Sequence, residues 1–372
     1  MGSKRKRQNI AWAFGMLAAI LLTIIAGSGG QIRLNDRMLI QGIGVDMQGE
    51  QVLVSAHVSQ STKEGKILLQ QAEGSTVLEA LDKLVQKSGK IPLYSHNMVV
   101  VLGKSCAESG VEGVLDFFVR YYETRPSVSL FLSDGKASEL FEYQENGEHL
   151  DAEDLVRIGH SGAVNGWSVN VRVIDFVNQL KGAGTAAYLP VLTCNQDGAE
   201  VVKTGVFRGD RYEAAFSPEE SRVLLLLTDG LYGGQMVAEI PECGKVTFSF
   251  QTGTASIEST IEDGVPHFSV FADCEMEISS MDLMNPSRND LIPDMEKTLE
   301  EQLTKQIQDT IQRSTGELHA DPFGFGRLLM QRESNWWKAN GENWENWMGK
   351  SVYEVESDIK VNRVEQEITP IY

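Results

Sequence analysis

Histidines and carboxylates are the residues of this 372-residue chain that could carry catalysis or metal binding. His96 directly follows Ser95, but neighbouring residues of a strand point to opposite faces, so the two cannot act as nucleophile and base. We therefore predict a polar pair at the start of a strand. The other histidines have no metal-ligand spacing; they are His57, His149, His160, His267 and His319. We predict no catalytic residue, metal site or cofactor from this set.

Motifs for cofactor binding and acyl transfer are missing from the sequence. The segment Gly42-Ile43-Gly44 has neither the third glycine nor the following helix of a dinucleotide-binding motif, and no phosphate-binding loop or G-x-S-x-G motif occurs. A catalytic pair of carboxylates, as in glycosidases, remains an alternative, although no two acidic residues stand out in the sequence. Four tryptophans could line a sugar-binding surface, but their spacing fits one helix face and favours packing. These are Trp336, Trp337, Trp344 and Trp347.

Two arginines, Arg120 and Arg125, flank the end of a predicted helix. The default role for both is a contact with the helix C-terminus, whose dipole favours cations, or a salt bridge. Together with Ser95 and His96, they are our candidates for defining the fold or contacting partners. The cysteines lack close pairs, so we favour partly buried free thiols and leave one or two disulfides open. They are Cys106, Cys194, Cys243 and Cys274.

The N-terminus predicts attachment to a membrane. A basic flank at residues 4–7 precedes an uncharged, mostly apolar run at residues 10–27. Such a flank stays cytoplasmic and directs the following chain outward. An uncleaved anchor over residues 10–27 is favoured over a cleaved signal segment, because the small-residue site at 26–28 is a weak match. The net charge of −19 argues against a nucleic-acid partner, since phosphate binding needs a basic surface.

Residues 74–140 show the clearest local pattern. Thr76 and Glu79 form a capping box, helical spacing follows, and Gly89 supplies the stop. A short strand is predicted at 98–102, a second helical stripe from Val111, and another strand at 127–132. Before this stretch, segments 39–46 and 51–58 predict a β-hairpin, with a third strand at 66–70. After it, we expect a helix over 175–181 and an extended segment at 186–192, with Pro190 marking a sheet edge.

The second half of the chain predicts strands first and helices late, which is typical of α+β domains. Strands are expected at 201–208, 212–215, 234–240 and 245–251, with a hairpin at 256–263 and 267–276. A long helix over 289–314 has an apolar residue at every fourth position. A tryptophan-rich helical segment reaches residue 348 and a strand follows at 352–364, while the apolar run 224–227 has no assignable type.

The fold class predicted from these elements is mixed, combining α/β and α+β parts in a multi-domain chain. Residues 1–30 would be the basic flank and hydrophobic anchor or signal segment. A mixed-sheet α/β domain would span 31–135, and a mostly helical region 136–200. An α+β domain with the long late helix would span 201–372.

Several segments, taken in order, resemble the Ger(x)C family, the C subunits of nutrient germinant receptors in endospore-forming bacteria. They are GSTVLEALDKL, LYSHNMVVVLG, FFVRYYETR, Gly135-Lys136-Ala137, Thr204-Gly205-Val206-Phe207, DPFGFG, Trp337, Trp344 and YEVESDIKV. The resemblance implies a non-enzymatic, multi-domain subunit on the outer face of the spore inner membrane. It would act there with two integral-membrane partners, the A and B subunits.

The chain departs from this family at one position. Members are usually lipoproteins with a lipid-bearing cysteine just after the signal segment, whereas residues 24–31 contain none and Cys106 is the first cysteine. We therefore expect no lipidation and anchoring by residues 10–27. The leading hypothesis is a non-enzymatic receptor subunit needed for nutrient-triggered germination. The alternative is a membrane-anchored extracytoplasmic solute-binding protein or enzyme, and a structural adaptor is a third reading.

Overall fold

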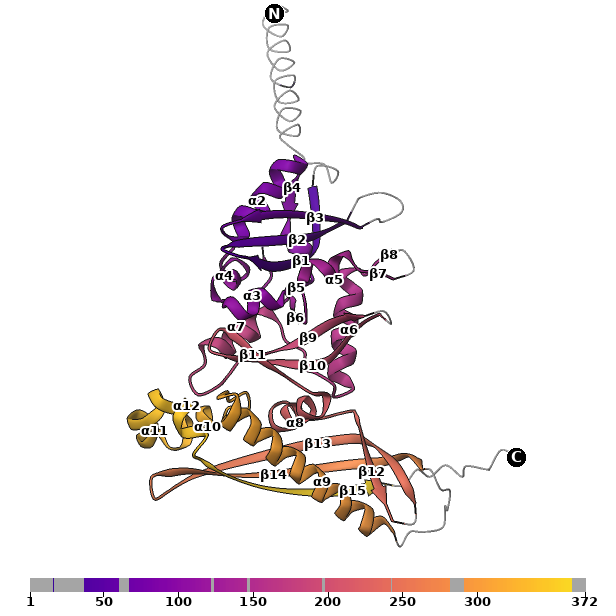
Figure 1. Cartoon of the computed structure of the whole chain (residues 1–372), viewed down its shortest axis with the longest axis vertical. Coiled ribbons are helices and arrows are strands. Elements are labelled where there is room, and N and C mark those ends of the chain that lie inside the picture. The colour runs from indigo at the N-terminus through magenta and orange to yellow at the C-terminus, as the bar shows by residue number, and fades with distance from the viewer. Residues whose placement is uncertain are drawn as a thin grey trace, which may run out of the picture.

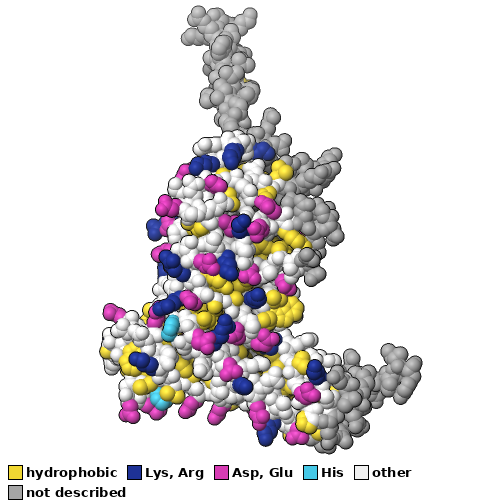
Figure 2. All heavy atoms as spheres, viewed as in Figure 1, with side chains coloured by type: hydrophobic (Ala, Val, Ile, Leu, Met, Phe, Trp, Pro, Cys, Tyr) yellow, Lys and Arg dark blue, Asp and Glu magenta, His cyan; other side chains and the backbone are white. Residues whose placement is uncertain are grey.

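The computed structural model describes residues 37–59, 67–121, 124–145, 148–195, 198–241, 243–281 and 291–362, together with Met16. The molecule is elongated, with one mixed sheet toward the N-terminal end and a second, antiparallel-rich sheet at the opposite end (Figure 1). Acidic and basic side chains are interspersed over the face that Figure 2 shows. The negative net charge is therefore spread over the visible surface.

The first sheet has nine strands in the order β11-β10-β9-β6-β5-β1-β2-β3, with β4 also paired to β1. Strands β1 and β2 form the predicted hairpin and pair antiparallel, whereas β5 pairs parallel with both β1 and β6. The strands are β1 (Arg37–Gln48), β2 (Gln51–Ser59), β3 (Ile67–Gly74), β4 (Ile91–Leu93), β5 (Val99–Leu102), β6 (Ser129–Ser133), β9 (Tyr188–Asn195), β10 (Gly198–Arg208) and β11 (Arg211–Phe216).

Helices cover both faces of this sheet. Val100 and Leu102 of β5 belong to one buried cluster, while Val99 and Val101 belong to another that includes residues of α5 and α6. The strand is therefore apolar at every position, as expected for a strand buried on both faces. The remaining elements are α2 (Val77–Ser88), η2 (Tyr94–His96), α3 (Lys104–Ser109), α4 (Glu112–Arg120), α5 (Ala137–Glu142), β7 (Gln144–Glu145), β8 (Glu148–His149), α6 (Ala152–Val164) and α7 (Val173–Lys181).

Helix α2 begins and ends where its sequence predicts. The Thr76 side chain accepts a hydrogen bond from the Glu79 backbone N–H at 3.2 Å, and the Glu79 carboxylate accepts one from the Ser75 N–H at 2.8 Å. Gly89 ends the helix in the left-handed conformation, with φ of 65°. Orphan backbone donors at the helix start are thus satisfied locally, without help from distant residues.

The second sheet has the order β12-β13-β14-β15. One face of it is covered by α9 (Ile292–Gln312), whose buried stripe consists of Met295, Leu299, Leu303, Ile307 and Ile311. The strands are β12 (Gln235–Ile240), β13 (Gly244–Glu262), β14 (Val265–Met281) and β15 (Val352–Asn362). After α9 come η4 (Arg313–Glu317), α10 (Phe325–Arg332), α11 (Ser334–Asn340), η5 (Gly341–Asn343) and α12 (Trp344–Met348).

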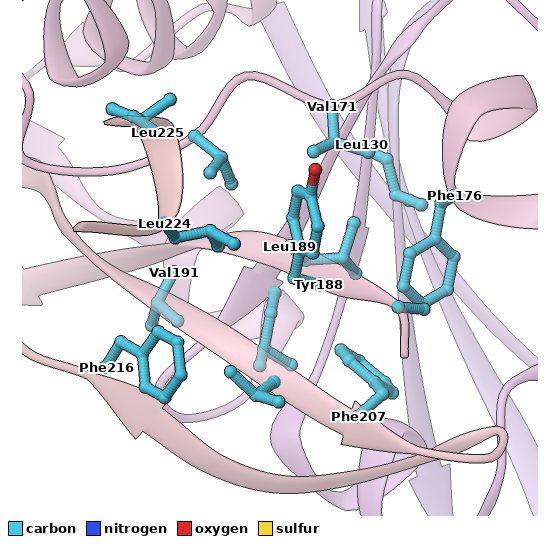
Figure 3. Close-up of a cluster of buried hydrophobic side chains, with 14 of the residues drawn as sticks. Leu130, Val171, Phe176, Tyr188, Leu189, Val191, Phe207, Phe216, Leu224 and Leu225 are labelled. Carbon is cyan, nitrogen blue, oxygen red and sulfur yellow. The ribbon is translucent and has the colours of Figure 1, made fainter. Parts of the chain in front are cut away.

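Helix α8 (Pro218–Thr228) joins the two sheets. Every residue from Ser221 to Leu227 is buried, and the helix contacts β10 and β11 on one side and β13 and α9 on the other. Figure 3 shows Leu224 and Leu225 of α8 beside Leu189, Val191 and Phe216 of the first sheet. One continuous apolar cluster therefore runs through both halves of the molecule.

The mixed α/β and α+β class and the long late helix are confirmed. Three local expectations are wrong. Pro190 does not mark an edge, because β9 lies between β6 and β10 and Pro190 pairs with Thr204. The segments 245–251 and 256–263 form one strand, β13, whose irregular pairing near Phe250 hides its continuity in the sequence pattern. The tryptophan-rich segment is helical as predicted, but its four tryptophans do not lie on one helix, because they are divided between α11 and α12, which η5 separates.

The division of the chain into four parts stays a prediction. The first sheet continues through β10 and β11, and so across residue 200.

Substituting Leu224 by Ala should lower the free energy of unfolding by about 2–5 kcal/mol, because this fully buried side chain links α8 to both sheets. The matched control is Leu78→Ala on α2, where the side chain is 40% exposed and the expected loss is under about 1 kcal/mol. Urea unfolding of the full-length variants measures both. Equal effects of the two substitutions would contradict a central role for α8.

Candidate functional site

Ser95 and His96 lie in η2, a single 3-10 turn between β4 and β5, and not at the start of a strand as predicted. The turn forms because it buries Tyr94, whose ring centroid lies 5.6 Å from that of Phe117 and 5.5 Å from that of Tyr121. Ser95 is half-buried and His96 is exposed. The pair therefore borders a surface and does not line a catalytic cleft.

Arg120 is the last residue of α4 and forms one of the two interactions expected of it. Its Nε lies 2.5 Å from Oδ1 of Asp116, one helical turn earlier, and the two side chains are 79% and 55% exposed. Such an exposed pair adds little to stability. Arg125 is exposed in the loop after α4, and its backbone carbonyl accepts a hydrogen bond from the Val128 N–H. Both side chains are thus accessible.

The ring contacts of Tyr94 bring η2 against the C-terminal half of α4, the helix that ends at Arg120. We call this end of the first sheet the β4 end. There β4 pairs with residues Arg37–Leu39, at the beginning of β1. Two exposed apolar side chains, those of Leu68 and Ile91, lie at the same end. Leu68 on β3 is linked through its β2 partner to the beginning of β1, and Ile91 on β4 pairs with the beginning of β1 directly. Figure 1 draws this end uppermost.

The predicted anchor at residues 10–27 lies outside the described residues, apart from Met16. Within the described part of the chain, no helix has both the length and the apolar character needed to cross a bilayer.

The four cysteines are free thiols, as favoured from the sequence. Burial raises the pKa of Cys106 and of Cys274 to about 12, and that of Cys194 to about 11. Nucleophilic cysteines need a lowered pKa, so these thiols are packing residues. In the described ranges, no group of His, Cys, Asp and Glu side chains has the arrangement of a metal site.

Asp321, the first residue of DPFGFG, is a buried carboxylate whose role the sequence analysis missed. Its Oδ1 accepts hydrogen bonds from the N–H groups of Gly324 and Phe325 at 2.8 and 3.1 Å. Its Oδ2 accepts from the Gly326 N–H at 2.8 Å and from the Trp344 Nε1–H at 3.0 Å. The carboxylate therefore holds the start of α10 and joins it to α12. An acidic residue ahead of a Gly-x-Gly turn is the signal that could have indicated this.

Asp46 at the end of β1 has a similar structural role. It is 1% exposed, and its oxygens accept hydrogen bonds from the N–H groups of Ala137 and Ser138 at 2.7 and 2.9 Å, at the start of α5. A Cβ on Gly103 would collide with the Asp46 carboxylate, so only glycine fits there. Gly103 and Ala137, both in motifs of the family resemblance, thus serve one buried contact.

These features define the class of protein as an elongated mixed α/β protein. Its distinctive polar residues either form buried structural contacts or lie exposed at the surface. Residues 30–194 match the spore germination protein N-terminal domain, and residues 203–365 match the spore germination B3/GerAC-like C-terminal domain. The chain therefore belongs to the Ger(x)C family of spore germination proteins.

Relatives of known name agree with this assignment. The spore germination protein GerQC of Bacillus cereus is 22% identical over 94% of this chain and 98% of its own length. The spore germination protein B3 of Bacillus subtilis (strain 168) is 22% identical over 84% and 85% of the two chains, and the putative spore germination protein YfkR of that strain is 21% identical over 83% and 85%. The crystal structure of the GerBC protein shares the fold, with a TM-score of 0.58 and 18% identity over 86% of this chain and 96% of that one.

The stability of this protein should depend on the titration of Asp321. Burial raises the pKa of this carboxyl from 3.8 to about 6, against the opposing effect of its four hydrogen bonds. Because the folded state binds the proton more tightly than the unfolded state, the contribution of Asp321 to stability is greatest below pH 4 and is lost as the pH rises through 6. Relative to Asp321→Asn, the wild-type free energy of unfolding should fall by roughly 2 kcal/mol between pH 4 and 7. Urea unfolding across this range measures the difference, and a flat or rising difference would contradict the assignment.

Proposed function

We propose that this chain is a non-enzymatic, extracytoplasmic subunit of a nutrient germinant receptor, needed for nutrient-triggered spore germination. The observation that carries the proposal is the match of both family domains, in order, over residues 30–194 and 203–365. The relatives are named as spore germination proteins and not as enzymes. The proposed location is the outer face of the spore inner membrane, and the proposed partners are the integral-membrane A and B subunits.

Attachment to that membrane would come from residues 10–27, since the basic flank and apolar run have the pattern of an outward-directed anchor. Residues 28–36 can span at most about 30 Å to the beginning of β1. The β4 end would therefore lie close to the membrane surface. The exposed apolar side chains of Leu68 and Ile91 at this end suit contact with membrane-embedded subunits. The exposed side chains of His96, Arg120 and Arg125 are further candidates for such a contact.

Deleting the gene for this chain should abolish germination with at least one nutrient and leave sporulation unchanged. Loss of optical density of purified spores after addition of single nutrients measures the response. Complementation by the wild-type gene should restore it. Normal germination with every nutrient, in a strain that also lacks paralogues of this chain, would overturn the proposed function.

Reversing charge at the candidate contact surface should weaken assembly. The double variant His96→Glu with Arg125→Glu changes two exposed side chains, so folding should be preserved while co-purification of the A and B subunits falls several-fold. The matched control is Arg157→Glu on α6, an exposed arginine on the opposite face of the first sheet. Equal recovery of the partners with both variants would place their contact elsewhere.

The second candidate is a membrane-anchored extracytoplasmic solute-binding protein or enzyme. It is favoured by one observation, an open cavity between α6 and α8. Calorimetry of the full-length chain against amino acids and sugars distinguishes the two functions. Stoichiometric binding of one nutrient by this chain alone would support the second candidate.

A further inference from the structure

Arg222 is a buried cation that has no counter-ion among the described residues. Its side chain is only 7% exposed, and its guanidinium lies over the ring of Phe250, 5.8 Å from the centroid. Its Nε has no hydrogen-bond partner, and within the described residues no carboxylate lies within ion-pair distance of it. Burial lowers the pKa of Arg222 and the charge of Glu219 partly opposes this, yet an arginine side chain stays protonated in proteins.

A neighbouring arginine, Arg313, does have a carboxylate partner. Nη1 of Arg313 lies 2.5 and 2.6 Å from the two carboxylate oxygens of Glu220, and Nη2 of Arg313 donates to the Ala215 carbonyl. Arg313 is more exposed than Arg222, at 33%, and so needs its partner less. Burying an unpaired charge costs free energy. Since Arg313 is paired, the missing partner of Arg222 indicates a place where a ligand of opposite charge could bind.

Arg222 lines an open cavity of about 480 Å³, which we call the waist cavity. Its walls come from α6, the following loop, β10 and the first turns of α8, and include Ile158, Trp167, Val202 and Pro218. Figure 2 shows hydrophobic side chains gathered at the right edge of the molecule, at the level where Figure 1 draws the lower end of α6. The volume lies in the range typical of sites for small ligands.

The chemistry of the walls selects the class of ligand. A guanidinium binds a carboxylate through two parallel hydrogen bonds, and the remaining walls are largely apolar. Glu200 and Glu219 are exposed at the rim, so they would repel a ligand that carries a second negative charge. The first turn of α8 is not the anion site, because Ser217 and Glu220 already form its capping box.

We propose that the waist cavity binds a small monocarboxylate with an apolar body, whose carboxylate pairs with Arg222. The apolar body lies against Trp167 and Val202, and the bound anion neutralises the buried guanidinium. The cavity lies beside α8, the helix that joins the two sheets, and its other walls come from α6, the loop after it and β10. This inference does not depend on the receptor function, and it concerns the same cavity that favours the solute-binding candidate.

The test measures binding of 3-phenylpropionate and of its uncharged analogue 3-phenylpropanamide to the full-length chain in detergent. Saturation-transfer NMR and calorimetry report the affinities. The wild type should bind the acid at least tenfold more tightly than the amide. Arg222→Met should bind both alike, and Val202→Glu should lose the acid while keeping its fold. The matched control is Val237→Glu on β12, an exposed valine outside the cavity, which should bind the acid as the wild type does.

Thermal unfolding separates this role from a packing role. Arg222→Met removes an unpaired buried charge, so without ligand its melting temperature should be unchanged or higher. Equal wild-type affinity for acid and amide, or no binding of the acid, would overturn the proposal. The proposal would also be overturned if Arg222→Met lowered the melting temperature and Val202→Glu bound the acid as tightly as the wild type does. The peptide N-acetyl-Ala-Ala-Phe reports the source of the carboxylate: tighter binding of the peptide indicates a chain end, and tighter binding of the free acid indicates a small molecule.

Discussion

Burial of α8 is the interaction on which the two halves of this molecule depend. A run of seven residues, Ser221 to Leu227, has no exposed face, because one side packs on β10 and β11 and the other on β13 and α9. Five of these seven residues, Val223 to Leu227, are apolar, and a helical segment that is apolar on all sides is stable only when it is enclosed. Neither sheet alone could enclose α8, so the helix makes a single continuous core out of two separately paired sheets.

The family motifs are explained largely by buried polar contacts. Asp46 fixes the start of α5 and requires glycine at position 103, while Asp321 fixes the start of α10 and accepts from Trp344. Each carboxylate is surrounded by hydrogen-bond donors, which is the condition for burying a charge at tolerable cost. Motifs of this kind identify a fold and are not evidence of catalysis, which agrees with relatives named for germination and not for a reaction.

Arg222 stands apart from these satisfied groups. Its charge is buried on α8, where both sheets meet, and among the described residues its Nε has no hydrogen-bond partner and no carboxylate forms an ion pair with it. The free energy that is lost by burying this unpaired guanidinium would be regained when a ligand of opposite charge binds beside it. The helix that joins the two sheets thus also carries a buried charge with no ion-pair partner among the described residues.

The elements that could be predicted from the sequence are those with clear local signals. The hairpin of β1 and β2, the capped helix α2 and the long stripe of α9 follow from periodicity and end signals, because these depend on neighbouring residues only. The tertiary structure alone decided the position of β9 inside the sheet, the helical state of the run 224–227 and the turn that holds Ser95 and His96. It also decided that Arg313 is paired and Arg222 is not. The physical reason is that these outcomes depend on which distant surfaces meet, and no local pattern records that.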